Sequence, residues 1–526
     1  MLPMPVDSAP VARLIAASNP AAGEVLREFE TADAANVNAA VARARVAQPA
    51  WQATPVRERL AILKRFQTLL NDRKIQVART ITSEAGKPVA EALLTEVLVV
   101  LDATRFISQE AHAFLRDEPV AHGSLAAKAK RGRIIREPHG VIGIISPWNY
   151  PFSIPATETL AALVTGNAVV LKPSELTPLS SLMLQELLKE AGLPAGVFQL
   201  IVGDAPTGVA LVESSIDKLV FTGSVATGKR IAQMAAQRLL PVVLELGGKD
   251  PMIVLEDANL DVASSGAVWG AFVNAGQACL SVERCYVQRS IYEKFVAVCV
   301  GKATQLRVGS GFDPDTDVGP LIHERQLRMV EEQVADALAH GANVLCGGRR
   351  LPSLGQNFYT PTVLTDVTHQ MRVMREETFG PVLPIMPFET DADAIRLAND
   401  SAYGLAASVW TSNRARGDAI ARQLSAGTVM INDAVSCFAI SEAPHGGVKA
   451  SGIGRTHGRF GLEGMVRVKY LDSDLLPNMK KPWWYGYGSN VSRATEGFLD
   501  FQFARGWGAR LRGALRSAGL IFRNRR

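Results

Sequence analysis

The most informative part of this sequence reads L-E-L-G-G-K-D at residues 244–250 and V-N-A-G-Q-A-C at residues 273–279. Glu245 precedes two glycines, which places a carboxylate beside backbone that another group can approach closely. Cys279 follows small residues, and this favours an accessible thiolate. Covalent catalysis through sulfur needs such a nucleophile together with a base that handles protons or water, so the pair is a candidate catalytic site. A buried structural cysteine is the alternative interpretation of Cys279.

Length and composition indicate a globular protein of two or three domains. The chain has 526 residues, of which 47% are hydrophobic and 20% are charged. Its five cysteines are odd in number and show no CxxC spacing, which argues against a disulfide framework or a structural zinc site. A reducing cytoplasm fits this cysteine usage best. Neither a metal site nor a nucleic-acid partner is expected.

The charge is unevenly placed along the chain. The first residues lack the pattern of a signal peptide, and no run of about 18 apolar residues predicts a membrane span. The net charge is +5, but ten Lys and Arg from Lys480 onward face only Glu496 and Asp500. That segment therefore carries +8 and residues 1–479 carry −3. The basic part of the protein is its tail.

The N-terminal third predicts helices and then a buried strand. Residues 36–115 show helical spacing of apolar side chains, and residues 116–139 are polar. The run V-I-G-I-I-S-P-W-N-Y-P at 141–151 predicts a parallel strand with Asn149 at its carboxyl end, where ligands of open α/β sheets bind. The Asn149 amide is either an oxyanion donor or a turn residue.

Two further strand ends carry polar residues. The segment N-A-V-V-L-K-P-S-E at 167–175 ends in Lys172, Ser174 and Glu175, which suit a ribose but are equally compatible with a solvated charge pair. Gly223 to Lys229 spells GxxxxGK, yet Arg230 stands where a P-loop has Ser or Thr. A P-loop ATPase is therefore rejected.

The ordered set of motifs closely resembles the aldehyde dehydrogenase superfamily over roughly residues 18–472. The matching segments are E-L-G-G-K at 245–249, G-Q-A-C at 276–279, F-T-G-S at 221–224, E-E-T-F-G-P at 376–381, G-T-V-M-I-N at 427–432 and H-G-G-V-K-A-S-G-I-G-R at 445–455. His445 departs from the pattern, because the family often has an aromatic residue there. The resemblance implies an α/β fold with a Rossmann-type cofactor domain, an α/β catalytic domain and a small β oligomerisation element.

The resemblance also implies the domain layout. Residues 18–119 and 140–246 would bind the cofactor, and residues 247–445 would carry the nucleophile. Segments 120–139 and 461–479 would form hairpins that link subunits of a homodimer or homotetramer. Residues 480–526 extend beyond the family's usual end.

A mechanism follows from the resemblance. Cys279 would attack the aldehyde, Asn149 and the Cys279 N–H would hold the oxyanion, and Glu245 would activate water to release the acid. Because branches that transfer the acyl group to coenzyme A typically lack this glutamate, hydrolysis is expected. NAD is favoured over NADP, since a carboxylate at Glu175 disfavours a 2′-phosphate. The residues expected to bind the cofactor are Ser146, Trp148, Lys172, Ser174, Glu175, Gly203, Gly223, Ser224, Leu246, Glu377 and Phe379.

The substrate is expected to be a bulky, aromatic or long apolar aldehyde. Thr157 stands where several family members carry a bulky aromatic residue, and Tyr150 and Ile154 are placed on the same helix face. Glu158 in the same region would disfavour a negatively charged semialdehyde. A semialdehyde dehydrogenase of the same family remains the alternative. A cysteine hydrolase would want a histidine base, and His139 and His323 are distant in sequence. A non-enzymatic protein on this fold is the third alternative, against which the intact Cys279, Glu245 and Asn149 argue.

The tail predicts a surface-binding element. K-K-P-W-W-Y-G-Y at 480–487 places aromatic residues beside two lysines, as interfacial anchors do. Apolar residues from Trp507 to Phe522 then recur at helical spacing, with arginines largely on the opposite face. Such a helix can lie in the headgroup layer of an anionic membrane, which would place the cytoplasmic protein at the inner face of that membrane. An arm docked on its own subunit or on a neighbour is the favoured interpretation, because the four glycines between 506 and 519 weaken an isolated helix.

Overall fold

The computed structural model describes residues 13–481 and 483–522, and the chain divides into two compact units after Leu115, Arg136 and Arg467. The first unit holds both large sheets. It begins with a hairpin of β1 (Leu14–Ser18) and β2 (Val25–Glu30). Five helices follow where the sequence predicts helices: α1 (Ala34–Ala53), α2 (Val56–Asp72), α3 (Lys74–Ala85), α4 (Val89–Ala92) and α5 (Leu98–Phe114), with one π-helical turn over Leu93–Val97.

The first large sheet is doubly wound. Its strand order is β17-β9-β8-β5-β6-β7, and all neighbouring pairs are parallel except β17 with β9. The strands are β5 (Val141–Ile145), β6 (Ala168–Lys172), β7 (Phe198–Leu200), β8 (Lys218–Thr222), β9 (Val242–Glu245) and β17 (Gly452–Ile453). The connecting helices are α6 (Ser153–Val164), α7 (Pro178–Glu190), α8 (Ala205–Glu213) and α9 (Val225–Ala236). The chain order reverses between β5 and β8, and ligands bind at such switch points.

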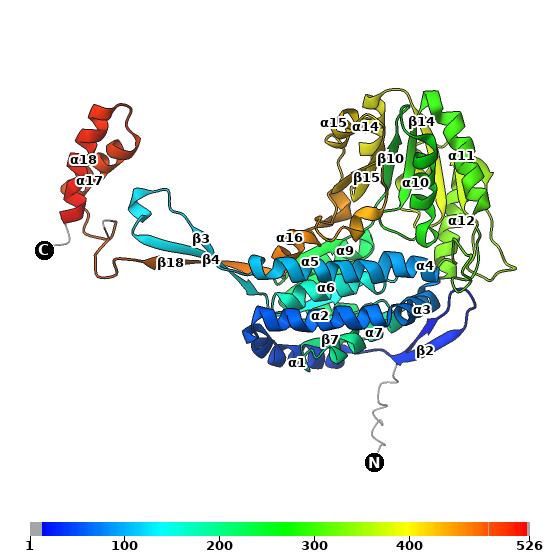
Figure 1. Ribbon diagram of the computed structural model, residues 1–526, viewed down its shortest axis with the longest axis horizontal. Coiled ribbons are helices and arrows are strands. Elements are labelled where there is room, and N and C mark those ends of the chain that lie inside the picture. Colours follow the sequence, from blue (N-terminus) through cyan, green and yellow to red (C-terminus); the bar gives the residue numbers. More distant parts are fainter. Residues whose placement is uncertain (1–12, 482, 523–526) are drawn as a thin grey trace, which may run out of the picture. The chain divides into compact units, whose positions relative to one another are not determined.

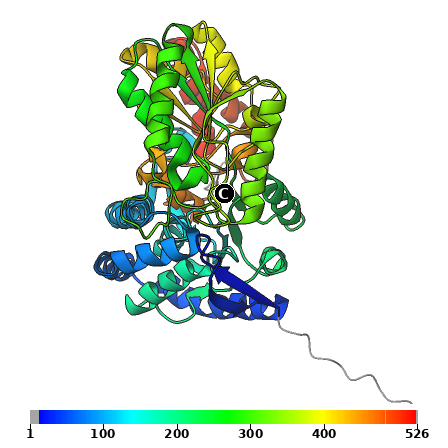
Figure 2. The ribbon, with the colours of Figure 1, turned by 90° about the vertical axis from the view of Figure 1, so that its right-hand side faces the viewer.

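The second large sheet carries the other half of the first unit. Its order is β12-β13-β14-β11-β10-β15-β16, parallel except for β12. The strands are β10 (Asp250–Val254), β11 (Val282–Gln288), β12 (Asn343–Cys346), β13 (Thr362–Thr365), β14 (Val382–Phe388), β15 (Ala406–Trp410) and β16 (Thr428–Ile431). Its helices are α10 (Leu260–Phe272), α11 (Tyr292–Gln305), α12 (Glu324–Ala339), α13 (Arg372–Arg375), α14 (Asp391–Asn399) and α15 (Arg414–Ala421). Figures 1 and 2 show these strands between helices.

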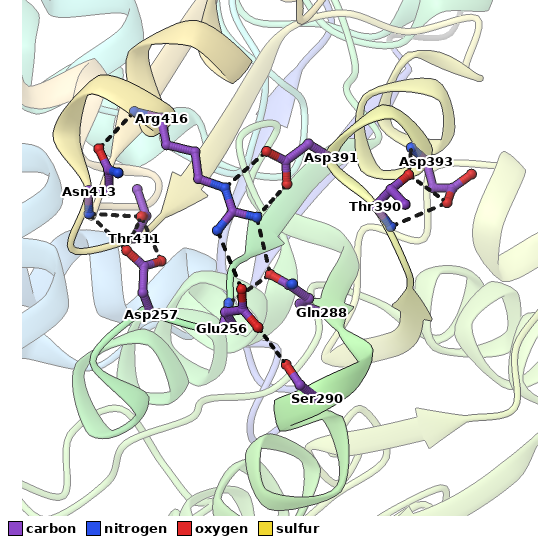
Figure 3. A network of polar contacts seen from close by, with 10 residues as sticks. All are labelled: Glu256, Asp257, Gln288, Ser290, Thr390, Asp391, Asp393, Thr411, Asn413 and Arg416. Carbon is purple, nitrogen blue, oxygen red and sulfur yellow. Dashed lines mark hydrogen bonds and ion pairs between the residues drawn. The ribbon is translucent and has the colours of Figure 1, made fainter.

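Polar contacts tie together the carboxyl ends of this second sheet (Figure 3). Arg416 forms a two-pronged ion pair with Asp391, with nitrogen–oxygen distances of 2.6 and 2.9 Å. Asp257, which follows β10, accepts hydrogen bonds from Thr411 Oγ1 and from the Asn413 N–H at 2.7 and 2.9 Å. Because this end of the sheet is closed by its own side chains, the opposite end of β10 and β11 is left for the cysteine loop.

The second unit contains a small antiparallel sheet and a helical hairpin. The sheet has the order β18-β4-β3, from β3 (Glu118–Val120), β4 (Lys130–Pro138) and β18 (Val466–Asp474). The short helix α16 (Gly458–Gly464) precedes β18 and belongs to the first unit. Beyond β18 the chain forms α17 (Ser489–Phe503) and α18 (Trp507–Phe522), which pack side by side (Figure 1).

The sequence predicts α18 but not α17. The two helices approach at glycines: a Cβ added to Gly497 would lie 2.4 Å from the Arg516 Cβ, and one added to Gly513 would lie 2.6 Å from the Gly497 carbonyl oxygen. The tail glycines at these positions therefore serve helix–helix packing. Arg523, Arg525 and Arg526, which the sequence analysis included in the basic tail, lie outside the described residues.

Candidate active site

Asn149 joins the first sheet to the cysteine loop. It follows the buried strand β5, and its side chain is 4% exposed. Its Nδ2 donates a hydrogen bond of 3.1 Å to the Gln277 carbonyl, two residues before Cys279. Its own carbonyl accepts from Lys87 Nζ at 2.8 Å and from Asn274 Nδ2 at 2.9 Å. The backbone carbonyl and one side-chain N–H of Asn149 are thus both held, and the second side-chain N–H remains for another acceptor.

A buried ion pair that sequence reasoning missed supports Asn149. Lys87 Nζ lies 2.8 Å from Glu96 Oε1, and both side chains are fully buried. Glu96 Oε2 accepts from the N–H groups of Phe152 and Ser153 at 2.8 and 3.0 Å. This carboxylate caps the start of α6, so the helix begins at Ser153. The prediction that Tyr150 shares a helix face with Ile154 and Thr157 is therefore wrong, because Tyr150 precedes the helix.

The turn before Cys279 has an uncommon backbone. Asn274 and Ala275 have φ values of 53° and 55°, and Gly276 follows at 74°. Two successive non-glycine residues in the left-handed region are strained, and such strain persists only where surrounding contacts enforce it. The Asn274 N–H donates to Glu91 Oε2 at 3.0 Å. A Cβ on Gly276 would lie 2.1 Å from the Gly380 carbonyl oxygen, so only glycine fits there.

Burial has the same electrostatic effect on Cys279 and on Glu245, because it disfavours the charged form of each side chain. Burial raises the pKa of the half-buried Cys279 thiol well above its ordinary value, and the nearby carboxyls of Asp250, Glu377 and Glu245 add to the effect. Burial likewise raises the pKa of Glu245, with Glu158 acting in the same direction. Neither carboxyl oxygen of Glu245 has a hydrogen-bond partner among the described residues. The carboxyl is thus held by its strand alone and is available to a water.

Glu377 and Phe379 lie beside the G-G-K loop. Glu377 Oε1 accepts from the Gly248 N–H at 3.0 Å, and burial raises the pKa of Glu377 to about 8. Phe379 stands edge-on to Trp148, with ring centroids 5.3 Å apart. Leu246 lies on the G-G-K loop, and its N–H donates to the Ser451 carbonyl at 3.0 Å. These four sequence-predicted residues therefore come from three loops, which follow β5 and β9 and precede β14.

A second buried ion pair, also missed from the sequence, fixes the 376–381 loop. Lys249 Nζ pairs with Glu283 Oε2 and donates to Thr378 Oγ1 at 3.0 Å. Glu283 Oε1 in turn accepts from the Phe379 N–H at 2.9 Å. Lone charged residues in a sequence are usually solvated, and no local pattern signals that these two are buried together.

The remaining predicted cofactor residues lie at or near the carboxyl ends of the strands of the first sheet. Lys172 Nζ donates to the carbonyls of Pro173 and Gly203, both at 2.7 Å, so backbone atoms already hold the ammonium that was expected to face a ribose. Glu175 beside it is half-buried. The Ser174 hydroxyl accepts from the Leu176 N–H at 3.3 Å.

Ser146, Gly223 and Ser224 complete this edge. The Ser146 hydroxyl is buried and has no hydrogen-bond partner among the described residues. The Gly223 N–H donates to the Glu245 carbonyl at 3.0 Å, and Ser224 caps α9 by accepting from the Thr227 N–H at 3.3 Å. An unpartnered buried hydroxyl, a helix start and carboxylates at Glu175 and Glu377 together fit a dinucleotide with two riboses and a pyrophosphate.

An apolar pocket lies next to Glu158. The side chains of Thr157 and Glu158 on α6 face it, together with Phe106 and Ile107 of α5 and residues of α16. Glu158 Oε1 accepts from Thr222 Oγ1 at 3.2 Å, and burial raises the pKa of Glu158 to about 8. The complete lining is Ala103, Phe106, Ile107, Thr157, Glu158, Ala161, Ser441, Thr456, His457, Gly458, Gly461, Leu462 and Met465. None of these described residues is a lysine or an arginine.

The chain belongs to the aldehyde dehydrogenase family, whose profile matches residues 6–471. It is an NAD(P)-dependent aldehyde dehydrogenase, as the sequence analysis predicted, and the α/β fold class is confirmed. It is similar to the NAD+ complex of aldehyde dehydrogenase from Bacillus cereus (TM-score 0.85, 37% identity, 88% of this chain and 94% of that one). It is also similar to Mycobacterium tuberculosis aldehyde dehydrogenase complexed with NAD+ (0.84, 37%, 91% and 96%).

Two curated relatives differ in the aldehyde that their names specify. The 4,4'-diapolycopene aldehyde oxidase of Methylomonas sp is 42% identical over 492 residues, covering 93% of this chain and 91% of the relative. The putative succinate-semialdehyde dehydrogenase [NADP(+)] of Mycolicibacterium smegmatis is 43% identical over 453 residues, covering 86% of each. NAD, with NADP also compatible, is confirmed as the cofactor class.

Within the described ranges, no helix combines the length and apolar character needed to cross a bilayer. The same residues contain no group of three or more His, Cys, Asp or Glu arranged to hold a metal ion.

Proposed function

We propose that this enzyme oxidises an aldehyde to the carboxylic acid through a covalent bond to Cys279 and releases the acid by hydrolysis. The Cys279 sulfur adds to the carbonyl carbon to give a thiohemiacetal. Loss of hydride then leaves a thioester, which water cleaves to the acid and the free thiol. A bound nicotinamide supplies the chemistry of accepting that hydride, and Trp148, Glu175, Glu377, Phe379 and the edge of the first sheet would hold the cofactor.

The observation that carries this proposal is the join between Asn149 and the cysteine loop. Because Asn149 Nδ2 is bonded to the Gln277 carbonyl while its second N–H is free, the amide is fixed and still able to donate. A donor held in place before reaction needs no reorganisation when the oxyanion forms. The Cys279 N–H would be the second donor.

Glu245 suits the role of base in the hydrolytic step. Its carboxyl oxygens have no hydrogen-bond partner in the described structure, so they are available to bind a water. Burial raises the pKa of Glu245, which makes its ionised carboxylate a stronger base than an ordinary one. A hydrolase that uses Cys279 would need an imidazole near the sulfur, whereas the described structure places carboxyls around it.

For the substrate we propose a bulky, aromatic or long apolar aldehyde. The pocket beside Thr157 is lined largely by apolar side chains and by no lysine or arginine among the described residues, so it offers no cation for the carboxylate of a semialdehyde. The Methylomonas relative is named for an aldehyde of diapolycopene, which is a long hydrocarbon polyene. Succinic semialdehyde is the second candidate, because the name of the Mycolicibacterium smegmatis relative specifies it.

Glu158 does not disfavour a semialdehyde by charge repulsion, as was expected from the sequence, because such repulsion needs a charged carboxylate. With its pKa raised to about 8, Glu158 is mostly protonated at neutral pH and exerts no such repulsion. The proposed preference against a semialdehyde therefore rests on the lack of a lysine or arginine among the described residues that line the pocket.

The test is a comparison of kcat/KM for decanal, benzaldehyde, succinic semialdehyde and acetaldehyde, each followed by NADH formation. We expect decanal and benzaldehyde to exceed acetaldehyde by about 10-fold or more, since each buried methylene contributes on the order of 1 kcal/mol. A clear preference for succinic semialdehyde would overturn the substrate assignment. Turnover that persists in Cys279→Ala would overturn the covalent route.

We further propose a cytoplasmic homodimer or homotetramer whose tail binds the inner face of an anionic membrane. Five free cysteines support a reducing compartment. Trp483, Trp484, Tyr485 and Tyr487 are all exposed, which suits the interfacial region of a bilayer. On α18, Trp507, Leu511 and Leu515 are 90%, 67% and 73% exposed and form one stripe at helical spacing.

A further inference from the structure

A cluster of buried polar groups extends from Glu245 to the wall of the apolar pocket. His445 Nε2 lies 3.8 Å from Glu245 Oε2, and both side chains are 5% exposed. The His445 ring meets the His457 ring edge-on, with centroids 5.7 Å apart. His457 in turn lines the pocket. The two imidazoles therefore connect the carboxyl to the pocket in two steps.

The backbone and Phe438 hold both imidazoles in place. The N–H groups of His445 and Thr456 each donate to the other's carbonyl at 2.8 Å, which fixes the segment that carries His457. Phe438 stands perpendicular to both rings, with centroids 5.1 Å from His445 and 4.6 Å from His457. Packing against Phe438 thus orders both rings, and a hydrogen bond of 3.3 Å between Thr456 Oγ1 and His457 Nδ1 adds a polar contact to the second ring.

Several polar atoms of this cluster have no hydrogen-bond partner among the described residues. Six buried atoms lack a hydrogen bond among the described residues: both carboxyl oxygens of Glu245, His445 Nδ1, His457 Nε2, Glu158 Oε2 and Ser441 Oγ. Buried polar atoms in folded proteins are bonded to protein or to ordered water in the great majority of cases. This many buried polar atoms without a hydrogen bond in one cluster indicate a hydrated path. Without water, each such atom would destabilise the folded protein by about 1–3 kcal/mol.

The charge state of the cluster suits proton passage. Burial lowers the pKa of His445 to about 3 and that of His457 to about 4. Arg455, which donates to the carbonyls of Gly447 and Gly454 at 2.8 and 2.6 Å, pushes the His445 pKa the same way. Both imidazoles are therefore neutral at working pH. A neutral imidazole has one acceptor and one donor nitrogen, so it can take a proton on one side and release one on the other.

We propose that His445 and His457 relay the proton that Glu245 removes from the hydrolytic water to the apolar pocket, with ordered water bridging the gaps. This inference rests on the proposed function of Glu245. When water attacks the thioester, its proton passes to Glu245, then by way of His445 and His457 to water in the pocket, and Glu245 is restored as the base. His445 acts through Glu245 and touches neither the aldehyde nor the sulfur, so it is a positioning and relay residue.

The test separates acyl formation from acyl release in His445→Phe, which places an aromatic ring at this position. We expect the pre-steady-state burst of NADH to keep its amplitude and rate, because the relay acts only after hydride loss. Steady-state turnover should fall about 10- to 100-fold. The remaining turnover should rise with pH between about 7 and 9, because hydroxide and buffer then replace the relay. Wild-type turnover should be flatter over that range.

Two further variants keep the test decisive. His445→Ala opens a cavity, and added imidazole should restore its turnover at least several-fold, whereas it should not help His445→Phe. His139→Phe is the matched control, because His139 is another partly buried histidine with a lowered pKa of about 4, and its pH profile should equal that of the wild type. A wild-type burst that disappears in His445→Phe, or a variant with wild-type turnover and pH profile, would overturn the relay. If the wild-type enzyme shows no burst, hydrolysis of the acyl-enzyme is not the slow step. That result would count against the proposed role of Glu245 rather than against the relay alone.

Discussion

At the scale of single residues, burial has the same effect on the two groups proposed to do the chemistry. It raises the pKa of the Cys279 thiol and of the Glu245 carboxyl, because both charged forms lose solvation. The residues that do chemistry are surrounded by others that only hold them, such as Lys87 behind Asn149 and Glu283 behind Phe379. The first group was predicted from motifs, and its roles remain predictions.

The holding residues could not be predicted, for a physical reason. Lys87 bonds to a carbonyl 62 residues away, and Glu283 accepts from an N–H 96 residues away. A burial that depends on such distant partners leaves no trace in the local spacing of polar and apolar residues. Lys172 shows the same limit, because its two backbone acceptors appear only when the 203 loop folds beside it.

Cys279 and Glu245 should fail differently when substituted. Cys279→Ser should lose nearly all turnover and also the burst, since an alcohol is a far weaker nucleophile than a thiolate. Glu245→Gln should retain a burst of NADH and accumulate acyl-enzyme. Its steady-state turnover should be reduced about 100-fold or more. Stopped-flow absorbance and intact-protein mass, which would show the trapped acyl group, check both outcomes. Full steady-state activity in Cys279→Ser would contradict the assignment.

At the scale of elements, the buried parallel strands were easy to predict and the tail was not. Runs such as V-I-G-I-I at β5 are apolar on both faces, and this marks a sheet covered by helices. In the tail, α17 does carry apolar residues at helical spacing (Val491, Ala494, Phe498 and Phe501), a signal that the sequence analysis did not use. Part of its contact with α18 is made by glycines, which leave no apolar signal.

Strand β18 is the element from which we predict oligomerisation. It lies at the edge of its three-stranded sheet, and Val468 and Tyr470 on one face are 66% and 48% exposed. Natural proteins rarely leave a long apolar edge strand uncovered. Val468→Lys should therefore lower the mass measured by light scattering after size exclusion.

Val46→Lys is the control for this experiment, because Val46 on α1 is an isolated valine that is 83% exposed. Its mass should equal that of the wild type. A monomeric wild type at assay concentration, or an unchanged mass in Val468→Lys, would show that this edge does not link subunits.

At the scale of the whole molecule, the tail lies beyond the part of the chain that the family profile matches. The family profile ends at residue 471. The match to the Methylomonas relative leaves only 7% of the chain uncovered, which is fewer residues than the 47 from Lys480 to the end, so that match includes part of the tail.

Liposome flotation tests the tail. The full chain should float with vesicles that contain anionic lipid, and a chain ending at Asp474 should not, since each basic residue near the surface contributes about 1 kcal/mol. Raised salt should weaken the binding, because it screens the arginines. Equal flotation of both chains, or of neither, would exclude membrane binding through the tail. A truncation that changes the oligomer mass instead would identify an arm docked within the oligomer.

The pairing of β17 with β9 has a consequence for how the enzyme is made. The edge of β9 beside Glu245 is covered only by β17, and Ser451, whose hydroxyl donates to the Gly247 carbonyl at 2.7 Å, is 204 residues further along the chain. At about 5–20 residues per second, a ribosome needs roughly 10–40 s to cover that distance. Until then the nascent chain exposes an unpaired edge of its six-stranded sheet, so the strand that carries Glu245 is among the last parts of the protein to be covered. The period of greatest risk for misassembly thus falls after most of the protein has already emerged.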